Sequence, residues 1–494
     1  MVIEAGSSLF PSLIPNWIEG RQTPAQSGAT FTKINPSDGK DLCAVARSGS
    51  ADVSAAVRAA RCAQIAWAAM SAVRRGEILH AIANSMEQRI DDLSDIVAAE
   101  TGKPRGGAKA EAQAAIALGR FMAGEGQRMY GRTTTSAAAN KWAMTIRQPL
   151  GVAGLIVAAN TPIANVAWKV FPALICGNAA VLKAAEDTPV AAWLFASIAF
   201  EAGLPAGVLN VVQGLGVEAG APLVDHPEVA VLSFTGSTGV GKQIGAAAGK
   251  RMARVSLELG GKNPFVVCDD ADLKNASRWA VQSAFSNAGQ RCASGSRLLI
   301  YESVYDEFRE ILLSDTKALK VGSTDGDDFG PVINERQLNN ILASIEKARG
   351  EGAKILTGGH RLTDAEHKDG FFIAPTLIEG VAPDAELSVT ELFGPVASLY
   401  PVKDFAHAVA LANDSPYGLT ACIHTRSVDR AMEFVRSVES GVVVVNAGTF
   451  GSEPHMPFGG VKQSGNGSRE PGTEALDIYS NLKDVYLVTD PSAL

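Results

Sequence analysis

The 494-residue chain has no basic cluster, no close cysteine pair and no unbroken apolar run long enough to cross a membrane. Its net charge of −8, with lysines and arginines scattered, argues against nucleic acid and anionic membranes as partners. An apolar segment at 166–182 is interrupted by Lys169, Pro172 and Gly177, so we predict no membrane span. Residues 1–15 lack the basic and apolar regions of a secretory signal.

The six cysteines, at positions 43, 62, 176, 268, 292 and 422, show no C-x-x-C spacing. This argues against a disulfide framework and against a structural zinc site. We therefore expect a reducing, cytoplasmic setting and no bound metal. With 46% hydrophobic residues, 19% charged residues and 49 glycines, the composition is that of a packed globular enzyme with two or three domains.

Apolar residues at helical spacing predict helices at 51–70, 72–100 and 106–124, followed by a threonine-rich hairpin or excursion at 131–149. From Gly151 onward, apolar strands alternate with helical segments, and the same alternation recurs over 264–445. This pattern predicts an α/β fold with doubly wound parallel sheets. In the first alternation the helices are expected at 164–175, 187–202, 217–225 and 240–248. A strand-like tail at 482–490 needs a partner, and a neighbouring subunit's sheet is one candidate.

A glycine-rich turn follows the predicted strand at 229–234. It places Gly236, Gly241 and Lys242 at the spacing of a P-loop, but Gln243 stands where Mg²⁺ coordination needs a Ser or Thr hydroxyl. We therefore interpret the turn as a helix N-terminus that holds a dinucleotide pyrophosphate over Gly236 and Ser237. A plain strand-to-helix turn is the alternative.

The usual G-x-G-x-x-G fingerprint of dinucleotide binding is absent, because Gly214-Leu215-Gly216 lacks the third glycine. Lys183 and Glu186 follow the strand at 179–183 instead. An acid in this position can accept hydrogen bonds from both ribose hydroxyls, which favours NAD over a 2′-phosphorylated cofactor. Charges just beyond a strand are also common on protein surfaces, so this pattern alone does not decide between the two interpretations.

Cys292 and Glu258 form the most informative pair in the chain. Cys292 lies in a glycine-containing loop before the strand at 296–301, where its thiol would be accessible and where Arg291 would favour the thiolate. Glu258 ends a predicted strand and precedes Gly260 and Gly261. Taken singly, Cys292 can also be interpreted as a small buried apolar residue, and Glu258 as a solvated charge at the end of a strand. Together they fit a thiol that attacks a carbonyl and a base that activates water for release of the acyl group.

Several motifs, in order, resemble those of the NAD(P)-dependent aldehyde dehydrogenase superfamily. The glutamate motif is matched at 257–262 and the nucleophile motif at 289–292. Further matches are FTGST at 234–238 with Gly241, ELFGP at 391–395, PYGLTA at 416–421 and PFGGVKQSG at 457–465. The resemblance runs from about residue 15 to the C-terminus.

The resemblance implies a role for each matched residue. Cys292 would be the nucleophile, Glu258 the base for deacylation, and Asn160 would hold the oxyanion together with a backbone N–H. Lys169 and Glu470 would relay protons behind Glu258. The residues that would bind the cofactor are Lys183, Glu186, Gly236, Ser237, Glu391 and Phe393. Glu391 would hold the nicotinamide ribose, with Phe393 beside it.

The chain departs from the family pattern at two places. Around the oxyanion asparagine, Ala158-Ala159-Asn160-Thr161-Pro162 carries small Thr161 where the family often has an aromatic residue. Ser468 is an extra residue before Arg469, which affects the register of Glu470. The first departure concerns the substrate, because Thr161 stands at the expected pocket wall.

The substrate pocket is expected to include Thr161, Asn165, Trp168, Arg291, Ala293 and the loop 447–456 with Phe450 and His455. Asn165 and Arg291 favour a polar aldehyde or a semialdehyde. The sequence around PGTEALD is similar to that of the ketoglutaric-semialdehyde branch of the family. The alternative is that Arg291 points away from the pocket and serves the scaffold. The sequence alone leaves both interpretations open.

The resulting hypothesis is NAD-dependent oxidation of an aldehyde to a carboxylic acid through a thioester on Cys292. A CoA-acylating aldehyde dehydrogenase is the first alternative, but Glu258 favours water over CoA as the acyl acceptor. A P-loop nucleotide hydrolase is a second, more distant alternative. We predict an NAD-binding domain (1–125 and 150–258), a catalytic domain (259–461) and a β oligomerisation arm (126–149 and 473–494). The resemblance implies a homodimer or homotetramer.

Overall fold

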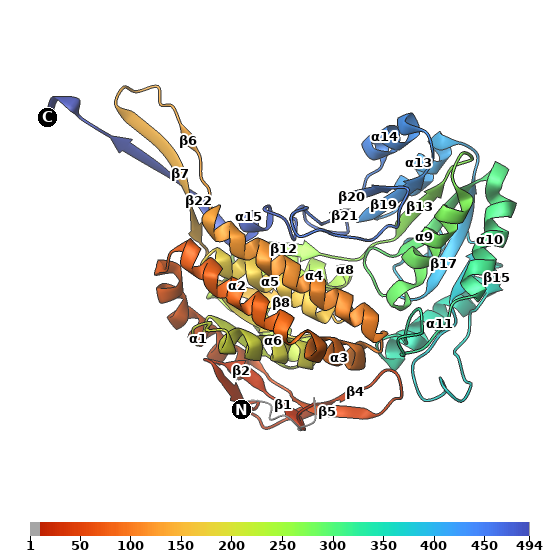
Figure 1. Ribbon diagram of the computed structural model, residues 1–494, viewed down its shortest axis with the longest axis horizontal. Helices are drawn as coiled ribbons and strands as arrows, with labels where there is room; N and C mark the ends of the chain where they lie inside the picture. Colours follow the sequence, from red (N-terminus) through yellow and green to blue (C-terminus); the bar gives the residue numbers. More distant parts are fainter. Residues whose placement is uncertain (1–9, 494) are drawn as a thin grey trace.

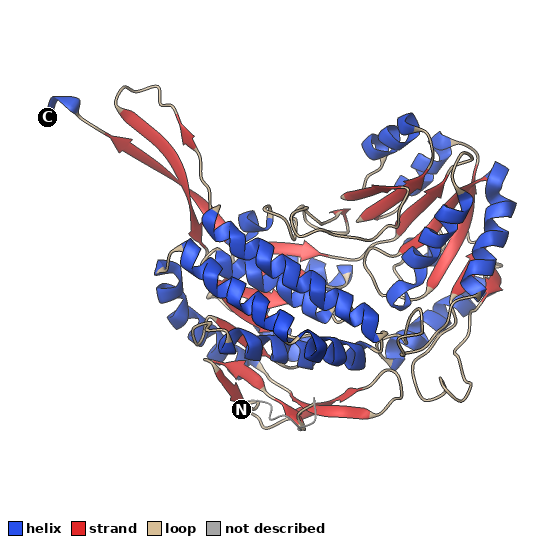
Figure 2. Cartoon of the chain, in the orientation of Figure 1, coloured by secondary structure: helices blue, strands red, loops and turns tan. Residues whose placement is uncertain are grey.

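The computed structural model describes residues 10–493, and these form two lobes and a projecting arm (Figure 1). Each lobe is built on a seven-stranded sheet with helices on its faces (Figure 2). The predicted α/β class is confirmed. Within residues 10–493, no helix is both long enough and apolar enough to cross a membrane.

The sheet of the first lobe contains five parallel strands, extended at one edge by two antiparallel ones. Its order is β12 (Arg254–Glu258), β11 (Val229–Thr235), β8 (Val152–Ile156), β9 (Ala179–Lys183), β10 (Leu209–Val212), β2 (Asn16–Ile18) and β3 (Arg21–Thr23). Every residue of β8, β9 and β10 is buried, as expected for strands covered on both faces.

Helices cover both faces of this sheet, and alternate strand residues divide between two apolar clusters. Val152, Val181 and Leu232 pack on one face against α1 (Ser50–Ala69), α7 (Ala221–Asp225) and α8 (Thr238–Lys250). Ala153 and Leu182 pack on the other face, against a larger helical layer. That layer contains α2 (Ala72–Gln88), α3 (Ile90–Thr101), α4 (Arg105–Gly124), α5 (Pro162–Ile175), α6 (Pro189–Glu201) and α15 (Ala475–Tyr479).

The strand order reverses between β8 and β11, because the chain runs from β8 to β9 and β10 on one side and returns to β11 and β12 on the other. In register, Thr235 pairs with Glu258, and Ile156 pairs with Lys183. The carboxyl ends of these strands therefore meet at one edge. A crevice at such a reversal is where open α/β sheets bind their ligands.

Two of the expected helices are wrong in detail. The helix predicted over 72–100 is broken at Arg89, whose backbone leaves helical geometry (φ −109°, ψ 26°), so that α2 and α3 are separate helices that both pack against α4. The helix predicted over 217–225 is a π-helical turn at Gly216–Gly220 followed by α7. Periodicity did not reveal either break, because the apolar spacing continues through both.

The sheet of the second lobe is parallel except for its first edge strand. Its order is β15 (Lys354–Thr357), β16 (Thr376–Glu379), β17 (Val396–Val402), β14 (Gly295–Tyr301), β13 (Asn263–Val267), β19 (Thr420–His424) and β20 (Val442–Val445). The helices of this lobe are α9 (Leu273–Phe285), α10 (Tyr305–Lys317), α11 (Glu335–Gly350), α12 (Glu386–Val389), α13 (Phe405–Asn413) and α14 (Val428–Ser437). Residues 259–262 connect β12 directly to β13. The carboxyl ends of the first sheet are thus joined to the amino ends of the second.

Shorter strands complete the first lobe and the region near residue 460. A small sheet contains β1 (Leu13–Ile14), β5 (Asp41–Ala46) and β4 (Thr30–Ile34), and β18 (Tyr417–Gly418) pairs with β21 (Val461–Lys462).

The arm projects from the first lobe as an antiparallel ribbon (Figure 1). It contains β6 (Thr133–Thr134), β7 (Lys141–Pro149) and β22 (Ser480–Val488), and β22 pairs with β7 from Ser480↔Pro149 to Val488↔Lys141. The C-terminal strand therefore has its partner in its own chain. Immediately before it, Leu476 and Tyr479 of α15 are fully buried in the core of the first lobe, so the ribbon itself begins at Ser480.

Candidate active site

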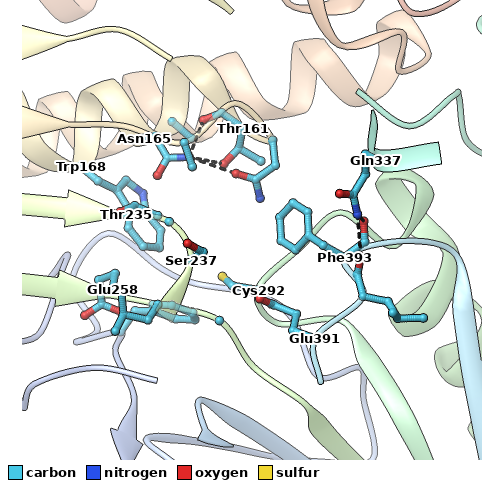
Figure 3. Close-up of a pocket in the computed structure, with 18 residues that line it drawn as sticks. Thr161, Asn165, Trp168, Thr235, Ser237, Glu258, Cys292, Gln337, Glu391 and Phe393 are labelled. Atoms are coloured by element: carbon cyan, nitrogen blue, oxygen red, sulfur yellow. Dashed lines mark hydrogen bonds between the residues drawn. The ribbon is translucent and has the colours of Figure 1, made fainter. Parts of the chain in front are cut away.

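Two cavities meet at Cys292, between the two lobes. The first has a volume of about 360 Å³ and extends along Ser237, Glu258, Glu391 and Phe393 (Figure 3). The second, of about 510 Å³, extends along Lys103, Glu111, Arg291 and Phe450. Both are lined by the same six residues where they adjoin: Asn160, Thr161, Ala164, Trp168, Cys292 and Phe458. A thiol at this junction is reachable from two directions.

The loop that carries Cys292 leaves α9 through three consecutive left-handed residues, Asn287 (φ 56°), Ala288 (φ 55°) and Gly289 (φ 67°). A Cβ on Gly289 would overlap the carbonyl of Gly394. Both the positive φ of this residue and the lack of space beside it therefore require glycine. Such strain is typical of functional turns held by their surroundings.

One side chain from the second sheet, that of Asn263, holds the Cys292 backbone in place. Asn263 Nδ2 donates to the carbonyls of Cys292 and Ser294, both at 2.8 Å, and Asn263 Oδ1 accepts from the N–H of Thr420 at 3.0 Å. Cys292 is thereby attached to the amino ends of β13 and β19. Its position is set by the sheet rather than by the loop alone.

Burial raises the pKa of the Cys292 thiol to about 12, and the carboxylates of Glu391 and Glu258 act in the same direction. Arg291 opposes this rise, but its effect is the smallest of those acting on the thiol. Arg291 thus acts in the expected direction, toward the thiolate, but it does not decide the pKa of Cys292. The cause is desolvation, which disfavours the charged form and outweighs one nearby cation.

Asn160 lies just beyond the carboxyl end of β8, beside the Cys292 loop. Its Nδ2 donates to the carbonyl of Gln290 at 2.9 Å. Asn165 Nδ2 donates to Thr161 Oγ1 at 2.9 Å and to Asn160 Oδ1 at 3.3 Å (Figure 3). Asn165 is predicted from the sequence to line the substrate pocket; in the structure it lines the first cavity and supports this turn.

Glu258 ends β12 with only 5% of the residue exposed, and neither carboxylate oxygen accepts a hydrogen bond from any residue between 10 and 493. Burial raises its pKa well above the usual range, and the nearby Glu470 carboxylate adds to the rise. Lys169 and Arg469 oppose it. An unpaired, buried carboxyl group on a cavity wall is suited to take a proton near neutral pH.

Lys169 and Glu470 form a fully buried ion pair behind Glu258, with Nζ and Oε2 2.9 Å apart. Ser233 bridges them, because its Oγ accepts from Lys169 Nζ at 2.6 Å and donates to Glu470 Oε1 at 2.7 Å. The Tyr479 hydroxyl also donates to Glu470 Oε1, at 3.2 Å. The extra Ser468 therefore does not displace Glu470 from Lys169. Ser233 is not predicted from the sequence, where its signal is that of a lone polar residue inside an apolar strand.

The first cavity contains features suited to a dinucleotide. Ser237 caps α8, where the N–H groups of the first turn have no acceptor within the helix. The N–H of Gly236 donates to the carbonyl of Glu258 at 3.1 Å, so the sheet uses this donor, while Gly236 itself lines the cavity beside Ser237. Lys183 and Glu186 form an ion pair at 2.6 Å, at the carboxyl end of β9. Because β9 lies two strands from β11 in the sheet, this pair is about 10 Å from the end of β11.

At the other end of this cavity, Glu391 Oε1 accepts from the N–H of Gly261 at 3.0 Å. A Cβ on Gly260 would overlap the Glu391 carboxylate, so glycine lets the two segments approach. Burial raises the pKa of Glu391 to about 7. Phe393 has a left-handed backbone (φ 56°), and Gln337 Nε2 donates to its carbonyl at 3.1 Å. The strand reversal, the helix terminus and this glycine cradle fit a nicotinamide dinucleotide.

The second cavity contains five of the predicted substrate-pocket residues: Thr161, Trp168, Arg291, Ala293 and Phe450. The Arg291 guanidinium lies 4.8 Å from the centre of the Phe450 ring, and its buried Nε has no acceptor in the described chain. Arg291 therefore faces the cavity. His455 is exposed and lines neither cavity.

The sequence analysis missed the far wall and the mouth of the second cavity. Lys103 and Glu111 form a buried ion pair at 2.7 Å on its wall. Asp325, Asp327 and Asp328 line its mouth, together with Gly106 and Gly107. Ordinary surface charges give no sequence signal that they face a cavity. Among residues 10–493, no group of three or more His, Cys, Asp or Glu side chains is arranged to hold a metal ion.

Comparison with known proteins gives a consistent result. The model of the "Aldehyde dehydrogenase family" matches residues 23–485. Alpha-ketoglutaric semialdehyde dehydrogenase of Bacillus subtilis is 39% identical over 475 residues, covering 96% of this chain and 97% of that protein. Hydroxyisobutyraldehyde dehydrogenase of Mycolicibacterium austroafricanum is 39% identical over 479 residues, covering 96% and 94%.

Two solved structures share the fold closely. A betaine aldehyde dehydrogenase mutant from Staphylococcus aureus in complex with NAD+ superposes with a TM-score of 0.94 at 31% identity, covering 97% of this chain and 96% of that one. An NADP-dependent enzyme from E. coli superposes with a TM-score of 0.93 at 37% identity, covering 97% and 99%. With a thiol at the meeting point of two cavities and a family match along nearly its whole length, the chain belongs to the aldehyde dehydrogenase family.

Proposed function

We propose that this member of the aldehyde dehydrogenase family, an oxidoreductase acting on aldehydes, uses Cys292 as nucleophile, Asn160 as oxyanion donor and Glu258 as the base for hydrolysis. The observation that carries this proposal is the position of Cys292 at the junction of two cavities, with the unpaired Glu258 carboxyl on the wall of one of them.

In the first half of the cycle, Cys292 Sγ bonds to the aldehyde carbon, the thiol proton passes to water, and the carbonyl electron pair moves to oxygen. Asn160 Nδ2 carries two hydrogens, of which one donates to the Gln290 carbonyl and the other is available to that oxygen, together with a backbone N–H of the Cys292 loop. NAD bound in the first cavity would supply the acceptor for the hydride that leaves this carbon as the C–O double bond re-forms. The acyl group is left on Cys292 as a thioester.

In the second half, Glu258 removes a proton from water as the water oxygen bonds to the thioester carbon. The carbon–sulfur bond then breaks, releasing a carboxylic acid and restoring Cys292. The high pKa of Glu258 suits it to this role, because a base needs a pKa near the working pH. The buried Lys169–Glu470 pair lies behind Glu258 and supports a proton relay through Ser233.

NAD rather than NADP is the proposed cofactor. Glu186, held by Lys183 at 2.6 Å, would accept hydrogen bonds from both ribose hydroxyls and repel a 2′-phosphate. A similar structure contains NAD+, whereas another is described as NADP-dependent, so the family accommodates both. Ser237 would hold the pyrophosphate, and Glu391 with Phe393 the nicotinamide ribose.

The proposed substrate is an aldehyde with a carboxylate at its far end. Arg291 supports this, because its guanidinium lines the substrate side of Cys292 and its Nε lacks an acceptor in the described chain. The relative from Bacillus subtilis is named for a semialdehyde, which is an aldehyde of this class. Asp325, Asp327 and Asp328 stand at the mouth rather than beside the thiol.

The arm supports the proposed assembly into homodimers or homotetramers. Apolar side chains are exposed along the ribbon, among them Trp142, Ile146, Tyr486, Leu487 and Val488. Exposed apolar patches of this kind mark interfaces. We retain the division into an NAD-binding domain, a catalytic domain and an arm as a proposal, together with the cytoplasmic setting. Six cysteines without a disulfide support that setting.

A direct experiment follows NADH absorbance with propanal and succinic semialdehyde, in wild type, Cys292→Ala and Glu258→Gln. Wild type should turn over steadily, Cys292→Ala should show no NADH, and Glu258→Gln should give one burst and then stall. Turnover that persists in Cys292→Ala would remove the nucleophile assignment. Acyl-CoA formation on addition of CoA, with no acid released by wild type, would favour the acylating alternative.

A further inference from the structure

The buried ion pair of Lys103 and Glu111 makes contacts beyond itself. Lys103 precedes α4 and Glu111 lies within it, and each side chain is at most 7% exposed. Lys103 Nζ donates to Glu111 Oε2 at 2.7 Å and also to the backbone carbonyl of Asn160 at 2.9 Å. The cation is therefore shared between a carboxylate and the residue whose amide is proposed to hold the oxyanion.

The second carboxylate oxygen of Glu111 reaches the start of α5. Oε1 accepts from the N–H of Ile163 at 2.9 Å and from the N–H of Ala164 at 3.3 Å. Thr161 is the N-cap residue of α5, but its side chain makes no capping bond. Glu111 thus caps α5 from another helix, where N–H groups of the first turn need an acceptor and where a negative charge is stabilised.

These contacts close a ring around the turn that carries Asn160. Lys103 holds the carbonyl at residue 160, Glu111 holds the N–H groups at 163 and 164, and the ion pair joins the two. Asn287 Nδ2 adds a second bond to the Asn160 carbonyl at 3.2 Å, from the loop that carries Cys292. Both ends of the turn are therefore fixed by buried, charge-assisted bonds.

We propose that Lys103 and Glu111 are positioning residues that set the Asn160 amide relative to Cys292, so that the oxyanion donor is in place before the thiol attacks. The inference rests on the proposed role of Asn160. A displacement of about 1 Å at a reacting centre lowers rates by on the order of 100-fold. Loss of an oxyanion donor costs about 100- to 1,000-fold.

The central variant is Lys103→Met, which keeps the length of the side chain and removes its donors. Lys109→Met is the matched control, because Lys109 lies on the outer side of α4 and pairs only with exposed Asp91. We expect the rate of the NADH burst to fall about 10- to 100-fold in Lys103→Met, in line with a misplaced donor. We expect the burst rate of Lys109→Met and the NAD dissociation constant of both variants to stay near the wild-type values.

A double-mutant cycle separates positioning from general damage. If Lys103 acts through Asn160, Lys103→Met should add less than about threefold to the loss already caused by Asn160→Ala, because residues that act as a unit are not additive. The same fold loss with propanal and with succinic semialdehyde is expected, since the oxyanion is common to both. Losses that multiply, or a loss confined to the carboxylate-bearing aldehyde, would overturn the inference.

A second variant tests the inference if Lys103→Met does not fold. Glu111→Gln keeps an oxygen for the N–H of Ile163 and removes the charge that holds Lys103, so it should slow the burst by the same route. An unchanged burst rate in folded Lys103→Met, or in Glu111→Gln when only that variant folds, would refute the positioning role. An unchanged rate in Asn160→Ala would instead refute the proposed oxyanion role, on which this inference depends.

Discussion

Glu258 and Glu470 are neighbouring buried carboxylates with opposite surroundings. Glu470 accepts hydrogen bonds from Lys169, Ser233 and Tyr479, whereas neither oxygen of Glu258 accepts one from any residue between 10 and 493. The Glu470 carboxylate adds to the effect of burial in raising the pKa of Glu258, because a nearby like charge disfavours ionisation. One carboxylate is held by three hydrogen bonds, and the other remains free to exchange a proton.

The raised pKa of Glu258 predicts how stability depends on pH. Because the folded state favours the protonated form, the carboxyl contributes most to stability below its ordinary pKa of 4.5, and this contribution is lost as pH rises through the raised value. Glu258→Gln cannot ionise, so it should melt at a higher temperature than wild type at pH 8 and show a smaller difference at pH 5. Thermal melts across this range provide the measurement, and an equal difference at both pH values would contradict the prediction.

Breaking the buried pair should destabilise the first lobe. Lys169→Met leaves the Glu470 carboxylate buried without its cation, which should lower the free energy of unfolding by about 3–5 kcal/mol. The double variant Lys169→Met/Glu470→Gln should recover most of this loss, because no charge is left uncompensated. Denaturant titrations at pH 7 compare the variants. A double variant no more stable than Lys169→Met would show that packing, rather than charge, causes the loss.

Replacing Glu186 should relax the proposed preference for NAD. In Glu186→Ser the negative charge that repels a 2′-phosphate is absent, and Lys183 loses its ion-pair partner. We expect the ratio of kcat/KM for NADP to that for NAD to rise at least about tenfold, equivalent to about 1.4 kcal/mol. Glu228→Ser, at an exposed acid before β11, is the control and should leave the ratio unchanged. An unaltered ratio in Glu186→Ser would remove Glu186 from the ribose site.

Arg291 is expected to distinguish between aldehydes. Arg291→Gln should lower kcat/KM for succinic semialdehyde by about 10- to 150-fold, the effect of one hydrogen bond to a charged group worth about 1.5–3 kcal/mol. The value for propanal should stay within about threefold of wild type. Steady-state assays with the two aldehydes measure both effects. Equal losses for both would assign Arg291 to the scaffold, the alternative that its sequence position left open.

The left-handed backbone before Cys292 gives a further prediction. Gly289→Ala adds a Cβ that overlaps the Gly394 carbonyl, so both stability and the NADH burst should fall. Gly203→Ala is a matched control, since Gly203 also has a positive φ (95°) but no atom within 4 Å of an added Cβ. The control should lose about 1–2 kcal/mol and keep its burst. Similar burst rates in the two variants would indicate that this loop tolerates displacement.

The sequence predicted the features that depend on local pattern. The strands around Val152, Ala179 and Val229 were found because runs of apolar residues alternate with helical segments. Residues within compact motifs, such as Cys292 and Glu258, were also found, and both line the first cavity. Patterns of this kind indicate which residues are buried and where the chain turns. The burial of apolar strands is what brings them together in a sheet.

The remaining features depend on contacts between distant segments, which no local pattern records. The pKa of Cys292 could not be predicted, because it follows from the burial of the loop rather than from its neighbour Arg291. In the sequence, Lys103 and Glu111 cannot be told from ordinary surface charges, because their burial depends on the packing of α4 against α5. The partner of the C-terminal strand was likewise open, because β7 is distant in sequence.

The position of α15 has a consequence for how the protein is made. Leu476 and Tyr479 complete the core of the first lobe, although most of that lobe precedes residue 259. During synthesis at ~5–20 residues per second, the ribosome needs on the order of tens of seconds to travel from β12 to α15. Through that interval α15 has not yet been made, so the nascent first lobe lacks the two side chains that complete its core.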